Sequence, residues 1–559
     1  MSKSGTHSIP KWQIALVAGA AVGAVSLSYM IYKSRFSKSS SKEVKENGKI
    51  KDKKVKKDAS EEPETPLQKV INFKDEGNAL FKKGKYDEAI SFYTQAIFQC
   101  PEGFPTDLAT FYQNRAAAYE QLKKWSAVVE DTTKALEFNP KYEKALSRRA
   151  RAFESLGKLE ECLDDITTVC LIQHFQNQPA LMMADRVLKE LGKQHAIEAI
   201  KNRKPMLPSK HFVKSYFISF SSDPVYEKLM DSSTPIGEGD VRGFLRAKLA
   251  FATENFEEII PACTEEINSS ESESEYYLEA LSLRASFHLL CASHKEAFDD
   301  LKAAIDTVDA DVKIKVNCLI KRASLYMQMG ENEKCLEDFE TAAELGPEIS
   351  DVYHHRGQVK LLMEKTTDAR QDFEKAVTLN PNYAIAYVQK CYTDYRYALM
   401  TQDVNLLTQS LGNFRRATEK FSNSSEVYIL FAQVLTERQE FSQAEKLYTK
   451  AAELDPSNAT ILVHRGLLQL QIEGKFEKAV ELMKESIKLD EKCEFAYETL
   501  ATVEVQRGNL LLAIELFDKA IALARTEMEM THLFSLRDAA ASQLRVTNRL
   551  NIGPQLLKT

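Results

Sequence analysis

Residues 77 to 101 read GNALFKKGKYDEAISFYTQAIFQCP, and this stretch decides the fold of the chain. Its informative residues are spaced as in two short helices joined by a turn: Gly77, Leu80, Gly84, Tyr86, Ala89, Tyr93, Ala96 and Pro101. The small residues allow two antiparallel helices to approach closely, and the two tyrosines fill the space between them. Pro101 cannot continue the second helix because it lacks an N–H donor. The stretch therefore predicts a helix–turn–helix unit.

The unit recurs with a period of about 34 residues, which is the tetratricopeptide pattern. Further copies lie at 109–142 and 143–176, near 240 and 278 in degenerate form, and in a clearer run from 316 to a unit at 494. The unit that begins at 384 is looser and carries an insertion. We expect an all-α fold, a superhelical solenoid in two blocks of three and about eight repeats, preceded by one transmembrane helix.

This pattern divides the chain into seven parts. They are a short N-terminal tail (1–13), a transmembrane anchor (14–32), a basic flexible linker (33–66), the three-repeat block (67–176), a connecting helix and hinge (177–239), the second block (240–527), and a C-terminal cap helix and tail (528–559). Four aromatic residues of the hinge, Phe212, Tyr216, Phe217 and Phe220, are expected to form a buried strap. The alternative is that they form a binding edge.

The stretch from Ile14 to Tyr32 contains no charge. As a helix rising ~1.5 Å per residue it spans ~28 Å, close to the ~30 Å of a bilayer core. Basic residues crowd the linker after it, so the positive-inside rule puts the long C-terminal part in the cytosol. A cleaved signal peptide is the alternative, although its apolar part is usually shorter. Gly19 and Gly23 form a GxxxG pair, which leaves a homodimer open.

Charge and motif content exclude several classes of function. The formal charge is −7, and residues 1–66 hold 13 Lys or Arg against 7 Asp or Glu, so that part carries +6 and the rest −13. An acidic body argues against a nucleic-acid partner. Catalytic, nucleotide-binding and zinc-binding motifs are missing, which predicts a protein that is not an enzyme and has no cofactor or metal. The pair His354 and His355 is expected to be hydrogen-bonded or exposed.

Five polar residues of the first block form the candidate binding site: Lys74, Asn78, Asn114, Lys144 and Arg148. They belong to the first helix of each of three successive repeats, and these helices line the concave surface of such a solenoid. Two of the spacings are i, i+4, so both members of each pair face one way. Three cations and two amides suit paired carboxylates, such as a terminal carboxylate beside an aspartate. The alternative is a solvated cationic face.

Together the five residues resemble the dicarboxylate clamp with which tetratricopeptide cochaperones hold the EEVD tails of heat-shock proteins. The whole plan, with KDEGN, NRAAAY and KALSRRA in the clamp and SYFISF in the hinge, resembles one family. This family is the seventy-kilodalton class of import receptors of the mitochondrial outer-membrane translocase. The resemblance covers nearly the entire chain.

The resemblance implies a mitochondrial outer-membrane receptor that spans the membrane once, with its N-terminus in the intermembrane space and its C-terminal domain in the cytosol. It would dock heat-shock chaperones of the seventy- and ninety-kilodalton classes and receive hydrophobic preproteins with internal targeting signals for handover to the import channel. Its other partners would be translocase subunits and the lipid bilayer. No motif assigns residues to the preprotein groove. The alternative is a clamp-bearing cochaperone or assembly scaffold on another membrane, such as the endoplasmic reticulum.

Overall fold

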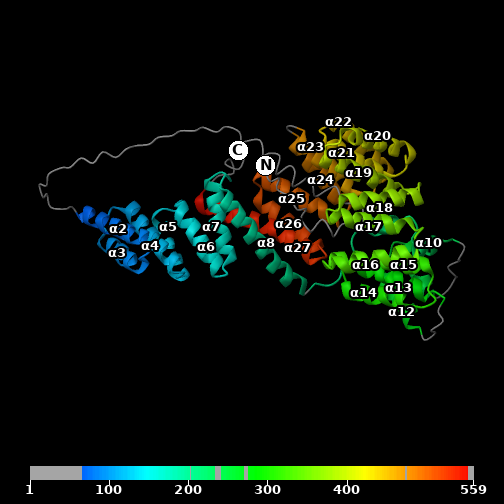
Figure 1. Ribbon diagram of the computed structural model, residues 1–559, viewed down its shortest axis with the longest axis horizontal. Coiled ribbons are helices and arrows are strands. Elements are labelled where there is room, and N and C mark those ends of the chain that lie inside the picture. The colour runs from blue at the N-terminus through cyan, green and yellow to red at the C-terminus, as the bar shows by residue number, and fades with distance from the viewer. Residues whose placement is uncertain (1–65, 202, 233–240, 270–274, 473–474, 552–559) are drawn as a thin grey trace. The chain divides into compact units, whose positions relative to one another are not determined.

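The computed structural model describes residues 66–201, 203–232, 241–269, 275–472 and 475–551. Every regular element in these ranges is helical (Figure 1). The predicted N-terminal tail, anchor and nearly all of the linker lie outside the described residues. Among the described helices, none combines the length and the apolar character that a membrane crossing needs.

The first block consists of three antiparallel helix pairs. These are α2 (Pro66–Lys82) with α3 (Tyr86–Gln99), α4 (Pro105–Gln121) with α5 (Trp125–Phe138), and α6 (Glu143–Ser155) with α7 (Leu159–Ile172). Gly84 and Gly157 take positive φ angles of 77° and 73° in the turns inside their pairs, a conformation that glycine adopts without steric cost. A Cβ on Gly77 would lie 2.7 Å from the ring of Tyr93. The small residue and the tyrosine of the repeat pattern therefore meet as expected.

The second block begins at residue 243 and contains eight helix pairs in the described chain. The pairs are α11 (Gly243–Ala252) with α12 (Ile259–Asn268), α13 (Tyr277–Leu290) with α14 (His294–Asp306), α15 (Val312–Gln328) with α16 (Asn332–Leu345), α17 (Ser350–Leu362) with α18 (Thr366–Leu379), α19 (Ala384–Thr401) with α20 (Val404–Lys420), α21 (Ser425–Glu437) with α22 (Phe441–Leu454), α23 (Ala459–Gln471) with α24 (Phe476–Leu489), and α25 (Glu494–Arg507) with α26 (Leu510–Leu523). The short 3₁₀ helix η3 (Phe256–Glu258) precedes α12. The expected insertion lengthens α19 and α20.

The segment between the blocks is more regular than the predicted hinge. After α8 (Gln178–Lys201) come two short helices, α9 (Lys210–Ile218) and α10 (Pro224–Met230). The side chains of Ser209 and Asp223 cap their first N–H groups, and such caps satisfy donors that a helix start leaves unpaired. The prediction of an irregular hinge missed these caps, although serine and aspartate at those positions signal helix starts.

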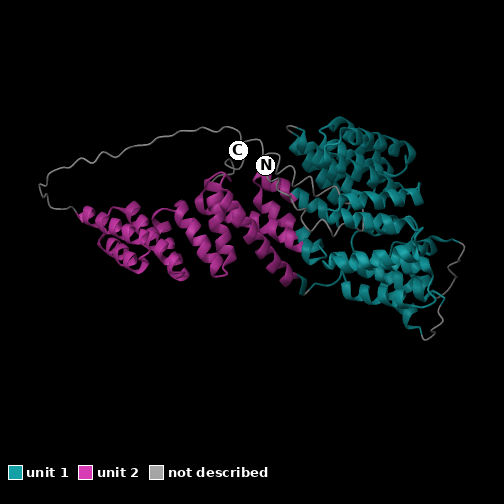
Figure 2. Ribbon diagram, viewed as in Figure 1, with its two compact units in different colours: residues 1–37, 200–500, 519–529 teal, residues 38–199, 501–518, 530–559 magenta. Residues whose placement is uncertain are grey.

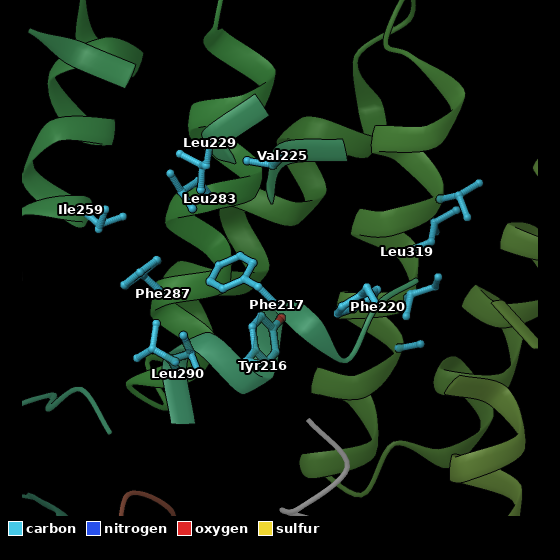
Figure 3. Close-up of a cluster of buried hydrophobic side chains, with 14 of the residues drawn as sticks. Tyr216, Phe217, Phe220, Val225, Leu229, Ile259, Leu283, Phe287, Leu290 and Leu319 are labelled. Atoms are coloured by element: carbon cyan, nitrogen blue, oxygen red, sulfur yellow. The ribbon is translucent and has the colours of Figure 1, made fainter. Parts of the chain in front are cut away.

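Tyr216 and Phe217 of α9 and Phe220 just after it form a buried strap rather than a binding edge, and the partly buried Phe212 packs against the same cluster. Tyr216, Phe217 and Phe220 are 4%, 1% and 9% exposed and pack among Phe287, Leu290 and other apolar side chains of the second block (Figure 3). A buried ion pair fixes the same segment, since Lys321 Nζ donates to Asp223 Oδ2 at 2.9 Å and both side chains are inaccessible to solvent. The expectation of a strap is confirmed by this packing.

The buried His354 contradicts the expectation that the histidine pair is hydrogen-bonded or exposed. His354 and His355 of α17 are 0% and 3% exposed. Neither ring nitrogen of His354 has a hydrogen-bond partner among the described atoms, and its ring lies 4.8 Å from that of Tyr383. Burial lowers the pKa of His355 to about 4 and that of His354 well below its ordinary value. The pair therefore fills the core as neutral aromatic rings.

We expect the second block to lose stability as the pH falls. A histidine in the unfolded chain takes up a proton near pH 6.5, whereas the buried rings stay neutral to a lower pH. The free energy of unfolding is therefore unaffected by these histidines above pH 6.5 and falls as the pH drops from 6.5 toward 4. The substitution His354→Leu should reduce the loss between pH 7.5 and 5.0 by about 2 kcal/mol. Urea unfolding of the two proteins at both pH values measures it. An equal pH dependence in the variant would show that His354 is protonated in the folded protein.

The chain forms two compact units that do not coincide with the two blocks (Figure 2). Within the described ranges, one unit contains the residues from 200 to 500 and from 519 to 529, and the other contains those from 66 to 199, from 501 to 518 and from 530 to 551. Most of the last helix, α27 (Glu527–Leu550), thus joins the unit of the first three repeats. The predicted domain boundaries do not include this association.

Specific contacts attach α27 to the first block. Arg545 donates two hydrogen bonds to the carboxylate of Asp164 on α7, at 2.8 and 2.9 Å, and Ser542 Oγ donates to the same group at 2.7 Å. On α8, His195 Nδ1 lies 2.8 Å from Asp538 Oδ2. A Cβ on Gly192 would lie 2.5 Å from the main-chain oxygen of Thr531, so only glycine permits this close approach.

A recurrent ion pair joins the two helices of five repeats. In each, an arginine of the first helix binds an aspartate 16 residues later on the second: Arg115 with Asp131, Arg149 with Asp165, Arg284 with Asp300, Arg322 with Asp338, and Arg356 with Asp372. Each guanidinium donates to both carboxylate oxygens, and each aspartate is less than a tenth exposed. Bidentate pairs of this kind fix the relative orientation of the two side chains as well as their distance.

Candidate carboxylate-binding site

The five candidate residues lie on α2, α4 and α6, the first helices of three successive repeats (Figure 1). These helices contact one another directly, α2 with α4 and α4 with α6. Lys74 and Asn78 are one turn apart on α2, Lys144 and Arg148 are one turn apart on α6, and Asn114 lies on the helix between them. The repeat thereby gathers residues from three separate stretches of sequence.

Hydrogen bonds orient the two asparagines. The hydroxyl of Tyr93 donates to Asn78 Oδ1 at 2.8 Å, and Asn114 Nδ2 donates to the same oxygen at 3.3 Å. Burial raises the pKa of Tyr93 to about 12, so its hydroxyl remains a donor at neutral pH. Because Asn78 Oδ1 accepts both bonds, the NH₂ group of Asn78 is left to donate to a ligand. Gln113 Nε2 extends this hydrogen-bond network by donating to Asn114 Oδ1 at 3.1 Å.

Arg148 is held by groups of the protein itself. Its Nε donates to Glu120 Oε2 at 2.7 Å, and its Nη1 donates to the main-chain oxygen of Gln113 at 3.4 Å. Arg151 Nε donates to the other oxygen of Glu120, also at 2.7 Å. Burial alone would raise the pKa of Glu120, but its hydrogen bonds with the two guanidinium groups lower it. Arg148 therefore already has an acidic partner within the protein.

The two lysines are more accessible to a ligand. Lys74 Nζ lies 3.1 Å from the carboxylate of its neighbour Asp75, and the Lys74 side chain is 26% exposed. Lys144 is exposed and has no ion-pair partner among the described residues. A site with two available ammonium groups, donating amides and a fixed guanidinium can neutralise two carboxylates through charge-assisted hydrogen bonds.

The structure brings some candidates together and leaves others apart. Asn78 and Asn114 are in direct contact, and Arg148 reaches them through the main chain of Gln113. Neither lysine has a hydrogen bond to these three residues in the described chain. Sequence reasoning missed Tyr93, Gln113 and Glu120. Gln113 immediately precedes Asn114 in the sequence, and Tyr93 reaches Asn78 from the second helix of the same repeat. Glu120 reaches Arg148 from the preceding repeat.

Metal chemistry has no visible basis in this part of the molecule. Within the described ranges, no group of three or more His, Cys, Asp or Glu side chains could hold a metal ion. The nine cysteines are free, and eight of them are buried.

Comparison with known proteins identifies the class and then the family. The family models described as tetratricopeptide repeat match residues 76–97, 316–348, 350–383 and 429–492. The chain is thus a tetratricopeptide-repeat protein.

Two relatives narrow this class, and one solved structure is also similar to the chain. The human "Mitochondrial import receptor subunit TOM70" is 45% identical over 87% of this chain and 81% of its own length. The protein of the same name from Saccharomyces cerevisiae is 27% identical over 88% and 82%. The crystal structure of yeast Tom70 has a TM-score of 0.49 at 27% identity, and the match covers 88% of this chain and 99% of that one. The chain belongs to the TOM70 family of mitochondrial import receptors, which are not enzymes.

Proposed function

We propose that this receptor docks cytosolic heat-shock chaperones of the seventy- and ninety-kilodalton classes by their EEVD tails. The same receptor then receives hydrophobic preproteins with internal targeting signals and hands them to the import channel. Membership of a family of import receptors supports the role in import. The tail-binding role rests on the geometry of Lys74, Asn78, Asn114, Lys144 and Arg148.

The observation that carries this proposal is the oriented pair of amides on α2 and α4, within three adjacent first helices that also carry Lys74 and Lys144. The Tyr93 hydroxyl and the Asn114 amide both donate to Asn78 Oδ1, which leaves the Asn78 NH₂ group for an anion. A terminal carboxylate accepts from this donor and from Lys74 or Lys144, and the aspartate side chain beside it accepts from the remaining cations. An internal aspartate without the chain end offers only one of these two carboxylates.

The second block supplies the proposed surface for preproteins. Its described helices from α11 to α24 form seven pairs that contact one another in sequence, and stacked repeats of this kind create an extended concave face. The groove residues are not assigned. A tail-binding block and a cargo-binding block on one chain would gain affinity because the second contact is intramolecular once the first has formed.

We place this receptor in the mitochondrial outer membrane. The uncharged stretch from Ile14 to Tyr32 would anchor it there by a single crossing, with a short intermembrane-space tail and a cytosolic C-terminal domain. Other translocase subunits and the bilayer itself are then its neighbours, and the GxxxG pair Gly19 and Gly23 offers a contact for a homodimer.

A comparison of two peptides tests the tail-binding role. A peptide ending in EEVD is titrated into the full chain, and the same peptide with an amidated C-terminus serves as the control. We expect the free peptide to bind at least tenfold more tightly because amidation removes one of the two carboxylates and its charge. Isothermal calorimetry measures both affinities. Equal affinities would exclude a carboxylate clamp.

A further inference from the structure

Glu120 is an acidic residue in a site built for acidic ligands. It lies on α4, six residues after Asn114, and its side chain is 14% exposed. One carboxylate oxygen accepts from Arg148 and the other from Arg151, each at 2.7 Å. A carboxylate of the protein thus already occupies the position that a ligand carboxylate would take against these two cations.

The arrangement changes the charge that a ligand meets. Arg148 and Arg151 together carry two positive charges, of which Glu120 cancels one. Arg148 is bound to Glu120 through Nε, so other N–H groups of its fork remain for a ligand. An anion that approaches Arg148 is attracted by the guanidinium and repelled by Glu120. Among the described residues, the only acidic group paired with either Lys74 or Lys144 is Asp75, which is exposed next to Lys74.

Resting on the tail-binding function proposed above, we propose that Glu120 is a specificity-determining residue of the clamp. It holds Arg148 in place and offsets its charge, so that an acidic peptide binds well only when it also presents a terminal carboxylate to the lysines and amides. Acidic segments without a free chain end are rejected. Glu120 thereby lowers the affinity for all acidic peptides but increases the preference for peptides with a free C-terminal carboxylate over internal acidic segments.

The substitution Glu120→Gln removes the charge and keeps the shape and one acceptor oxygen. We expect the EEVD peptide to bind the full-length variant about 3- to 10-fold more tightly at low salt, with a steeper decline as salt is added, because exposed charges are screened by ions. The amidated peptide should gain more than the free peptide does, so the ratio of the two affinities falls. A residue that only braced Arg148 would give unchanged or weaker binding and an unchanged salt dependence, which would overturn the inference.

A matched control lies one repeat further along the chain. Glu154 of α6 occupies the same repeat position as Glu120, but it pairs with Arg186 of α8, whose Nε donates to it at 2.8 Å. The variant Glu154→Gln carries the same change in charge and should bind both peptides as the unsubstituted chain does. An equal gain in this variant would mean that net charge alone, and not the place of Glu120, sets the affinity, and would also overturn the inference.

A second variant approaches Glu120 from its other partner. Arg151 is half-exposed, so Arg151→Gln should leave the fold intact. Glu120 then pairs with Arg148 alone, and its negative charge is less compensated. We therefore expect the EEVD peptide to bind about 3-fold more weakly. An unchanged affinity would contradict the inference. If the unsubstituted chain prefers the free peptide and Glu120→Gln does not tighten binding, only the role of Glu120 fails. If neither protein binds the free peptide, the tail-binding function fails and this inference fails with it.

Discussion

The full chain carrying Lys144→Ala and Arg148→Ala is expected to bind an EEVD peptide about 3 kcal/mol more weakly, on the order of a hundredfold. Each substitution removes a cation from α6, and charge-assisted hydrogen bonds to carboxylates are the stronger kind. Loss of Arg148 has a second effect, because Glu120 keeps only Arg151 as a partner and its repulsion of the ligand is less compensated. Calorimetric titration with the free peptide measures the loss.

A control variant with the same change in net charge distinguishes an effect of the site residues from an effect of the overall charge. Lys141 precedes α6 and Lys193 lies on α8; both are exposed. Replacing these two lysines by alanine should change the peptide affinity less than threefold, because exposed charges at a distance are screened. A comparable loss in both double variants would show that overall charge, rather than the clamp, holds the peptide.

The largest effect on stability is expected at the recurrent arginine–aspartate pairs. In Arg149→Ala, the carboxylate of Asp165 loses both of its guanidinium bonds, at 2.6 and 2.8 Å, and its side chain is only 1% exposed. Breaking a buried pair by removal of one partner typically costs about 3–5 kcal/mol, because the remaining charge is uncompensated. Urea unfolding, followed by circular dichroism of the full chain, measures this change.

Two further variants distinguish a buried charge from simple loss of contact. Removing both partners, in Arg149→Leu with Asp165→Leu, should restore much of the stability, since apolar replacements of a buried pair are often tolerated. The exposed pair of Lys189 with Asp185 on α8 provides the other comparison. Lys189→Ala should cost less than about 1 kcal/mol. If Arg149→Ala costs as little, the pair does not contribute through its burial.

The repeat pattern predicted most of the fold because its signal is local. Gly77 and Tyr93 lie 16 residues apart and meet within one helix pair, so a period of small and bulky residues is enough to find them. The same separation joins Arg149 to Asp165, and a search for arginine followed by aspartate at this distance would have found all five bridges. The capped helices α9 and α10 were missed because the period stops there, although their caps were readable.

Interactions between repeats were harder to predict. The five polar residues of the clamp could be chosen because the frame assigns each a position on a first helix. That frame does not say which acidic residue of a neighbouring helix also reaches the site, and Glu120 was overlooked for this reason. Burial of His354 was missed because a histidine on a first helix can point to solvent or to the core, and only the packing of Tyr383 and Phe373 decides between them.

The attachment of α27 to α7 has a consequence for the order in which the protein is made. Ser542 binds Asp164, which precedes it by 378 residues. A ribosome adds about 5–20 residues per second, so roughly 20–80 s separate the synthesis of these two residues. During that interval the three N-terminal repeats have left the ribosome without their partner helix. The three N-terminal repeats therefore gain their contacts with α27 only after α27 has been synthesised, and until then a nascent chain carries the proposed tail-binding site without this helix.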